Sequence, residues 1–185
     1  MEINFDKYNS DRYYNYTLSK ENENDIIEYF LSADQKRKEE LMHNNVINFL
    51  HFSNLCQNII KWYPITQNDS VLEICGDFGQ LTGVLIDKSR KVVTVEPVKS
   101  HAEVIKERYK NVKKLSIFCS NIEDLEFNEK FDYISLIGVL EYAQNLCPNK
   151  EYSRYEAAVW LLNQVKKFLK SSGKILIATD NKFGI

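Results

Sequence analysis

The chain has 185 residues, of which 44% are hydrophobic and 27% charged, and its formal net charge is -2. This composition is typical of a folded globular domain, and the small net charge gives no electrostatic reason to expect nucleic acid or a membrane as a partner. No apolar run reaches the roughly 18 residues of a membrane-spanning helix, and the N-terminus is too polar for a signal peptide, so we expect a cytoplasmic protein. The four cysteines lack CxxC spacing and the three histidines lack metal-ligand spacing, so no metal site is expected.

Residues 1–64 are predicted to form an N-terminal arm followed by helices. The first 23 residues show no strand or helix period, and the tyrosine cluster between residues 8 and 16 fits either a disordered tail or an arm that folds over a ligand. A short helix is expected from Asp25. The spacing of apolar residues then predicts a longer helix from Lys36 to Tyr63, which Pro64 would end.

After Pro64 the pattern changes to alternating strands and helices. Such an alternation is typical of an α/β fold, in which helices cover both faces of a mainly parallel sheet. We therefore expect a three-layer α/β sandwich over residues 65–185, with ligands bound at the carboxyl ends of the strands. The predicted strands are Ser70–Cys75, Lys91–Val95, Leu115–Cys119, Tyr133–Ile137 and Lys174–Ala178.

The loop after the first strand, in VLEICGDFGQLT, contains Gly76 and Gly79. Glycine lets the backbone approach a ligand closely there, although many strand-to-helix turns contain glycine for steric reasons alone. The second strand ends in Glu96 and Pro97, and Glu96 lies 20 residues beyond Gly76. A carboxylate at this point accepts hydrogen bonds from the hydroxyls of a ribose; the plain alternative is a surface glutamate.

Two later strand ends carry weaker signals of a nucleoside site. The side-chain oxygen of Asn121 can accept from the exocyclic amine of a purine, and the N–H of Ile122 can donate to a ring nitrogen, but Asn121 is equally suited to a turn. Gly138 begins the run GVLEY, which is too apolar for a plain surface loop. Its glycine indicates a close approach of the backbone to a ligand.

In this order and spacing, these segments resemble the class I S-adenosylmethionine-dependent methyltransferases. VLEICGDFG is similar to their glycine-rich first motif, TVEP to the acidic end of their second strand, and SNIEDL to their adenine-contacting segment. FDYISLIGVLEYA and LKSSGKILIATDN resemble the fourth and fifth strand motifs. The resemblance covers about residues 65–185 and implies a Rossmann-like fold. WYP, IGVLEYA and DNKFG are also similar to methyltransferase domains found beside bacterial glycosyltransferases.

The resemblance implies a site for S-adenosylmethionine, with S-adenosylhomocysteine as the product. Gly76, Asp77 and Gly79 would pack around the methionine portion and the ribose, and Glu73 would anchor the loop or the ammonium group of the cofactor. Glycine is usual in the family at the positions of Cys75 and Asp77. A carboxylate at Asp77 would repel that of the methionine unless the side chain turns away, so we expect weakened cofactor binding.

The later motifs supply the rest of the implied site. Glu96, next to Pro97, would hold the ribose hydroxyls. Asn121 and Ile122 would contact the adenine, and the backbone at Gly138 would face the methionine amino group. The implied activity is methyl transfer to a small molecule or a saccharide precursor, with no nucleic acid or membrane partner.

Methyl transfer is an in-line displacement that depends chiefly on proximity and alignment, and a general base is needed only if the acceptor carries a proton. The candidates near the reacting end are Glu141, Tyr142, Asp180 and His101. No spacing singles one out, and His101, at the start of a helix, is expected to face solvent. We therefore assign no catalytic residue.

The family sheet has seven strands, whereas the predicted sheet stops after the fifth. The chain is thus expected to be either a piece of a longer protein or a short relative. An open sheet edge favours self-association or a partner domain that covers it. A non-catalytic cofactor-binding or interaction module is the alternative. A nicotinamide-dependent oxidoreductase is disfavoured, because the loop lacks GxGxxG spacing: Gly76 and Gly79 are three residues apart, and position 82 is Thr82.

Overall fold

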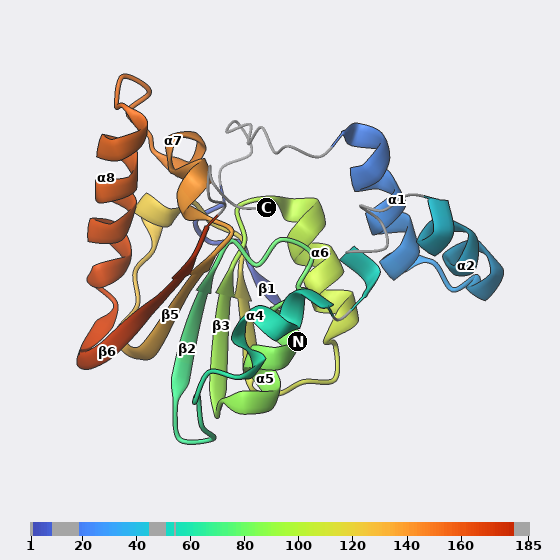
Figure 1. Cartoon of the computed structure of the whole chain (residues 1–185), viewed down its shortest axis with the longest axis horizontal. Helices are drawn as coiled ribbons and strands as arrows, with labels where there is room; N and C mark the ends of the chain where they lie inside the picture. Colours follow the sequence, from blue (N-terminus) through green and yellow to red (C-terminus); the bar gives the residue numbers. More distant parts are fainter. Residues whose placement is uncertain (1, 9–18, 45–50, 54, 180–185) are drawn as a thin grey trace.

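A computed structural model of the chain describes residues 2–8, 19–44, 51–53 and 55–179 (Figure 1). Within these residues the centre is a six-stranded sheet with the order β1-β4-β3-β2-β5-β6, in which every neighbouring pair is parallel. The prediction of a mainly parallel sheet is therefore confirmed. The strands are β1 (Ile3–Asn4), β2 (Ser70–Ile74), β3 (Lys91–Val95), β4 (Leu115–Phe118), β5 (Phe131–Ile137) and β6 (Leu169–Ala178).

Two strands differ from the sequence prediction by more than two residues. β1 lies within the arm that shows no period, and it pairs with the end of β4. A strand of two residues offers no alternation to read, so the sequence could not reveal it. β6 begins at Leu169 instead of Lys174, because a register shift opposite the start of β5 lets the polar segment before Lys174 join the sheet.

Helices cover both faces of the sheet, which confirms the three-layer arrangement (Figure 1). One face packs against α7 (Ala143–Leu146) and α8 (Arg154–Lys166). The other packs against α4 (Asn58–Lys61), α5 (Thr82–Lys88) and α6 (Lys99–Arg108). Short 3-10 turns, η2 (Ile122–Asp124) and η3 (Leu140–Tyr142), follow β4 and β5. Strands buried on both faces explain the continuous apolar runs in the sequence.

The N-terminal helices lie beside α6, at the right of Figure 1. They are α1 (Lys20–Leu31), which packs against α6, and α2 (Gln35–Asn44). None of the helices in the described ranges combines the length and apolar character needed to cross a bilayer.

The prediction of one helix from Lys36 to Tyr63 is wrong. The chain forms α2, then a 3-10 turn η1 (Leu55–Gln57) and the single turn of α4, while residues 45–50 lie outside the described ranges. The backbone N–H of Leu55 donates to the Ser53 hydroxyl at 3.5 Å, a local bond that competes with helix continuation.

The outer edge of β6 pairs with no described strand, because β5 is its one neighbour in the sheet. The expectation that a further segment or partner covers this edge stays a prediction. The division of the chain near residue 64 also stays a prediction, and it falls between α4 and β2.

Candidate cofactor-binding site

The strand order reverses between β2 and β5, with β3 and β4 on one side and β6 on the other. Loops that follow parallel strands meet at one edge of a sheet, and the reversal leaves a crevice between them. All ten predicted cofactor residues lie in or beside these loops or at the ends of the strands that precede them. The topology therefore brings them to one edge of the sheet.

The loop after β2 adopts left-handed backbone conformations at the positions where the family has glycine. φ is 54° at Cys75, 50° at Asp77 and 80° at Gly79. A residue with a Cβ pays roughly 1 kcal/mol for this conformation, although Asp tolerates it better than most. The departures from glycine thus leave the loop in the conformation that glycine favours, at a cost in strain.

Glu73 lies beneath this loop and is 3% exposed. Its Oε2 accepts hydrogen bonds from the hydroxyls of Thr82 and Thr94, each at 2.7 Å. A Cβ built on Gly76 would be 3.2 Å from the same oxygen and 2.4 Å from Thr94 Cγ2, so this position has room for glycine alone. Burial raises the pKa of the Glu73 carboxyl to about 7. These contacts favour a loop-anchoring role over contact with the ammonium of a cofactor.

Glu96 is completely buried beside the loop. It directly follows the last residue of β3, as the sequence predicts. Its Oε2 accepts from the N–H of Asp77 at 2.8 Å, and its Oε1 accepts from the N–H of Val98 at 2.9 Å. Burial raises the pKa of this carboxyl to about 7, although the charge of His101 opposes the rise. Two backbone N–H groups therefore fix the carboxylate, and each oxygen keeps a lone pair for a further donor. Pro97 is also buried.

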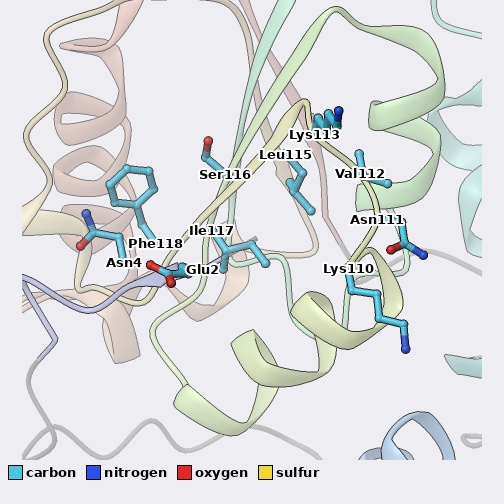
Figure 2. Close-up of a pocket in the computed structure, with 10 residues that line it drawn as sticks. All are labelled: Glu2, Asn4, Lys110, Asn111, Val112, Lys113, Leu115, Ser116, Ile117 and Phe118. Atoms are coloured by element: carbon cyan, nitrogen blue, oxygen red, sulfur yellow. The ribbon is translucent and has the colours of Figure 1, made fainter.

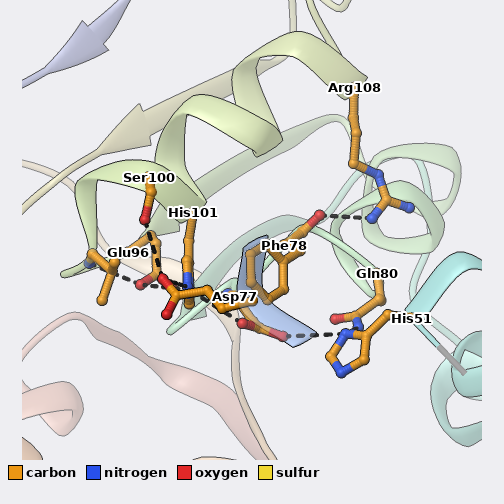
Figure 3. A network of polar contacts seen from close by, with 10 residues as sticks. His51, Asp77, Phe78, Gln80, Glu96, Ser100, His101 and Arg108 are labelled. Carbon is orange, nitrogen blue, oxygen red and sulfur yellow. Dashed lines mark hydrogen bonds and ion pairs between the residues drawn. The ribbon is translucent and has the colours of Figure 1, made fainter. Parts of the chain in front are cut away.

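The expectation that His101 faces solvent is wrong, because its side chain is 1% exposed (Figure 3). Nδ1 lies 3.2 Å from Asp77 Oδ1 and 3.8 Å from Glu96 Oε1. Nε2 lies 3.3 Å from Oε1 of Glu23 on α1. Helix α1 packs over this part of α6, and the sequence around His101 alone does not reveal that cover.

The side chain of Asp77 turns toward two histidines. Besides its contact with His101, its Oδ2 lies 3.8 Å from His51 Nδ1, and His51 also contacts the side-chain amide of Gln80 (Figure 3). Burial lowers the pKa of His51, which the charge of Asp77 partly offsets. The Asp77 carboxylate thus has positive or polar partners of its own.

Phe78 and Arg108 are parts of this site that the sequence analysis missed. Phe78 is fully buried, and it packs with Ile26 of α1 and Val104 of α6. Arg108 donates to the Phe78 carbonyl oxygen at 2.6 Å (Figure 3). His101, Val104 and Arg108 follow i, i+3, i+7 spacing, which was the available signal that they share one face of α6.

The two later strand ends differ in how open they are. Asn121 is 4% exposed and its Nδ2 donates to Asp124 Oδ2 at 3.0 Å, while the side chain of Ile122 packs in the hydrophobic core. Their contact with a base stays a prediction. Gly138 is exposed with φ of 68°, and a Cβ built on it would meet no described atom within 4 Å. Its backbone therefore borders open space at the end of β5.

A family model described as a methyltransferase domain matches residues 15–184. The chain belongs to the methyltransferase-domain family. One curated relative, ribosomal RNA small subunit methyltransferase A of Malacoplasma penetrans, is 30% identical over 114 residues. The match covers 62% of this chain and 42% of that protein, so this methyltransferase domain spans less than half the length of the relative.

Solved methyltransferases share the fold of this domain. Phosphoethanolamine N-methyltransferase 1 of Haemonchus contortus, in complex with phosphoethanolamine and S-adenosylhomocysteine, has a TM-score of 0.59 at 17% identity, over 86% of this chain and 31% of its own. N-methyltransferase NodS of Bradyrhizobium japonicum, in complex with S-adenosyl-l-homocysteine, has a TM-score of 0.54 at 15% identity, over 85% and 70%. The Rossmann-like fold of the class I methyltransferases, implied by the sequence, is thereby confirmed.

The methyltransferase domain also has an open groove of about 630 Å³ along β4, beside β1 (Figure 2). Lys110 and Lys113 lie at its rim, and Leu115 and Ser116 line it where β1 no longer pairs with β4. None of the ten predicted cofactor residues lines this groove, although all ten are described. The groove is therefore separate from the candidate cofactor site.

Proposed function

We propose that this methyltransferase domain binds S-adenosylmethionine at the edge formed by the loop after β2 and by Glu96, and that it serves methyl transfer. The observation that carries the proposal is the bond from the Asp77 N–H to the buried Glu96 carboxylate at 2.8 Å. It joins a left-handed glycine-type loop to the acid at the end of the next strand. A carboxylate so placed holds the hydroxyls of a ribose.

The residues present fit such a cofactor. Glu96 has unused lone pairs for a ribose, and the backbone at Gly138 borders space in which the methionine portion would lie. Glu73 keeps the loop in place from below. Because Glu96 is fully buried in this conformation, a ribose has to displace part of what covers it. Weakened cofactor binding, which the sequence predicts on other grounds, follows from this rearrangement as well.

S-adenosylmethionine would supply an electrophilic methyl group on a sulfonium. The protein then has to align the acceptor with that methyl group and exclude water. Glu141 is exposed and Tyr142 half-buried in the segment after Gly138, so both remain candidates for moving an acceptor proton. Asp180 lies outside the described residues. His101 is enclosed by carboxylates, and we therefore do not offer it as the base.

For the acceptor we propose a small molecule or a saccharide precursor, which the net charge of -2 favours over a polyanion. RNA is a second candidate, because the relative at 30% identity is named as a ribosomal RNA methyltransferase. That name weighs against the expectation that no nucleic acid is involved. The lysines at the rim of the β4 groove are a local basic feature that RNA could use.

The test is a calorimetric titration of the purified chain with S-adenosylmethionine, S-adenosylhomocysteine and NAD, followed by transfer of a labelled methyl group. We expect binding of the two sulfur compounds and none of NAD. Transfer to ribosomal RNA and transfer to sugars or small amines are then compared side by side. Binding without transfer to either class supports the non-catalytic module. No heat with either sulfur compound at millimolar concentration contradicts the proposal.

A further inference from the structure

One imidazole lies among three carboxylates that come from three separate segments of the chain. His101 on α6 contacts Asp77 of the loop after β2, Glu96 at the end of β3 and Glu23 on α1, at 3.2, 3.8 and 3.3 Å. The imidazole is 1% exposed and Glu96 is fully buried, so water screens the contact between these two little, whereas the side chains of Asp77 and Glu23 are 32% and 33% exposed. A neutral histidine has one donor and one acceptor nitrogen, whereas both nitrogens of His101 face carboxylates.

The positions of the ring nitrogens indicate the charge state. Nδ1 faces Asp77 and Glu96, and Nε2 faces Glu23. A neutral imidazole donates from one nitrogen and presents a lone pair at the other, which would here point at a carboxylate oxygen. The imidazolium carries a proton on both nitrogens and is therefore the form in which no ring lone pair points at a carboxylate.

The electrostatic surroundings agree with this form. Burial alone lowers the pKa of His101, but the close contact with Asp77 and the charges of Glu96, Asp77 and Glu23 raise it to about 8. The positive groups that face the cluster are His51, which contacts the other side of Asp77, and Arg108 on α6. Neither outweighs the three carboxylates.

The same histidine joins the loop to helix α1. Its ring lies against Phe78, with the ring centroids 4.0 Å apart, and Phe78 packs with Ile26 of α1. Arg108 donates to the Phe78 carbonyl oxygen and stacks on Phe30 of α1 at 4.1 Å. The loop, α6 and α1 thus form one packed unit around His101.

We propose that His101 is the positioning residue of the cofactor site: its imidazole fixes the side chains of Asp77 and Glu96 and ties them, through Glu23, to helix α1. This role rests on the proposed function and adds to it a specific dependence of cofactor affinity on pH. Held by His101, the Asp77 carboxylate does not turn toward the methionine carboxylate of a cofactor. The positive charge beside Glu96 favours the ionised form of that carboxyl, which accepts from the ribose hydroxyls.

The plot of cofactor affinity against pH should therefore have an acid limb and an alkaline limb. Affinity falls at low pH as Glu96, whose pKa is raised to about 7, gains a proton and loses acceptor capacity. It falls again at high pH as His101 loses its proton above about pH 8 and releases Asp77. Because Glu96, His101 and Asp77 interact, the apparent pKa values of the two limbs belong to the cluster as a whole and not to single residues.

The experiment is a calorimetric titration of the full chain with S-adenosylhomocysteine between about pH 5.5 and 9.5. His101→Gln should lose the alkaline limb, and its acid limb should move up by about one pH unit, which lowers affinity at pH 7 about fivefold. Glu23→Gln should move the alkaline limb to lower pH, because the imidazolium loses one of its carboxylates. His43→Gln, at an exposed position of α2, is the matched control and should follow the wild type.

Unchanged limbs in His101→Gln, or an equal loss of affinity at every pH, would overturn the role, because a purely structural histidine leaves the pH profile in place. If His101→Gln does not fold, the shift in Glu23→Gln decides, and an unmoved alkaline limb overturns the role. Absence of binding by the wild type at every pH contradicts the proposed function and this role together. Binding by the wild type without an alkaline limb contradicts this role alone.

Discussion

Replacement of Glu73 by glutamine should flatten the dependence of stability on pH. Burial raises the pKa of this carboxyl from 4.5 to about 7 in the folded chain. A raised carboxyl pKa means that the folded state holds its proton more tightly. The resulting stabilisation is complete below about pH 4.5 and is lost as the pH rises through about 7. At about 1.4 kcal/mol for each pKa unit, the loss amounts to roughly 3 kcal/mol.

Urea unfolding at a series of pH values measures this effect, with stability taken from the linear extrapolation. The wild type should lose stability as the pH rises from about 4.5 to 8, since the raised pKa values of Glu96 and His101 act in the same direction. Glu73→Gln should remove the part of this decline that comes from Glu73 and leave the part that comes from Glu96 and His101. Glu151→Gln, at an exposed position, should behave as the wild type. An equal decline in Glu73→Gln and the wild type would refute the assignment of a buried, proton-holding carboxyl beneath the loop.

Three substitutions test the packing of the loops after β2 and β5. Gly76→Ala should destabilise the fold by about 1–3 kcal/mol in urea unfolding, because its Cβ would lie 2.4 Å from Thr94 Cγ2. Gly138→Ala should lower the free energy of unfolding by only about 1 kcal/mol, because its φ of 68° is unfavourable for alanine. A larger loss for Gly138→Ala than for Gly76→Ala would contradict the packing described. Phe78→Ala should lose about 3–5 kcal/mol and expose α1 to proteolysis. Tyr155→Ala, at a side chain that is 78% exposed, is the control, and equal losses for the two aromatics would count against burial of Phe78.

The sheet could be predicted because its strands are buried on both faces and read as continuous apolar runs; the bounds of β3 are those predicted. Helix α8 shows where this reasoning stops. Apolar spacing within residues 151–170 predicts a helix with one face formed by Tyr155, Ala158, Val159, Leu162, Val165 and Leu169. Val165 is buried as expected, but Tyr155 and Val159 are exposed, and Ala157 and Leu161 complete the buried face. Apolar residues line more than one side of this helix, and contact with the sheet selects the side that is buried.

The candidate site divides in the same way. Glu96 and the glycine loop could be predicted because a fixed spacing along the chain relates them, and their hydrogen bond confirms that they meet. The position of His101 could not be predicted, because its partner Glu23 is 78 residues away and no local pattern relates the two residues. The side chain of Asp77 turns toward His101 of α6 and toward His51, and no local pattern predicts either contact, so the expected repulsion of a cofactor could not be judged without the structure.

The central claim is that Glu96 holds a ribose at this edge of the sheet. The most direct test is a calorimetric titration with S-adenosylhomocysteine near neutral pH, for the wild type and for Glu96→Gln. The wild type should bind, and the variant should bind more weakly by about 1–3 kcal/mol, because a charged hydrogen-bond acceptor is lost. Glu126→Gln, at an exposed position, should leave the affinity unchanged. Failure of the wild type to bind, or equal affinity of the wild type and Glu96→Gln, would contradict the claim.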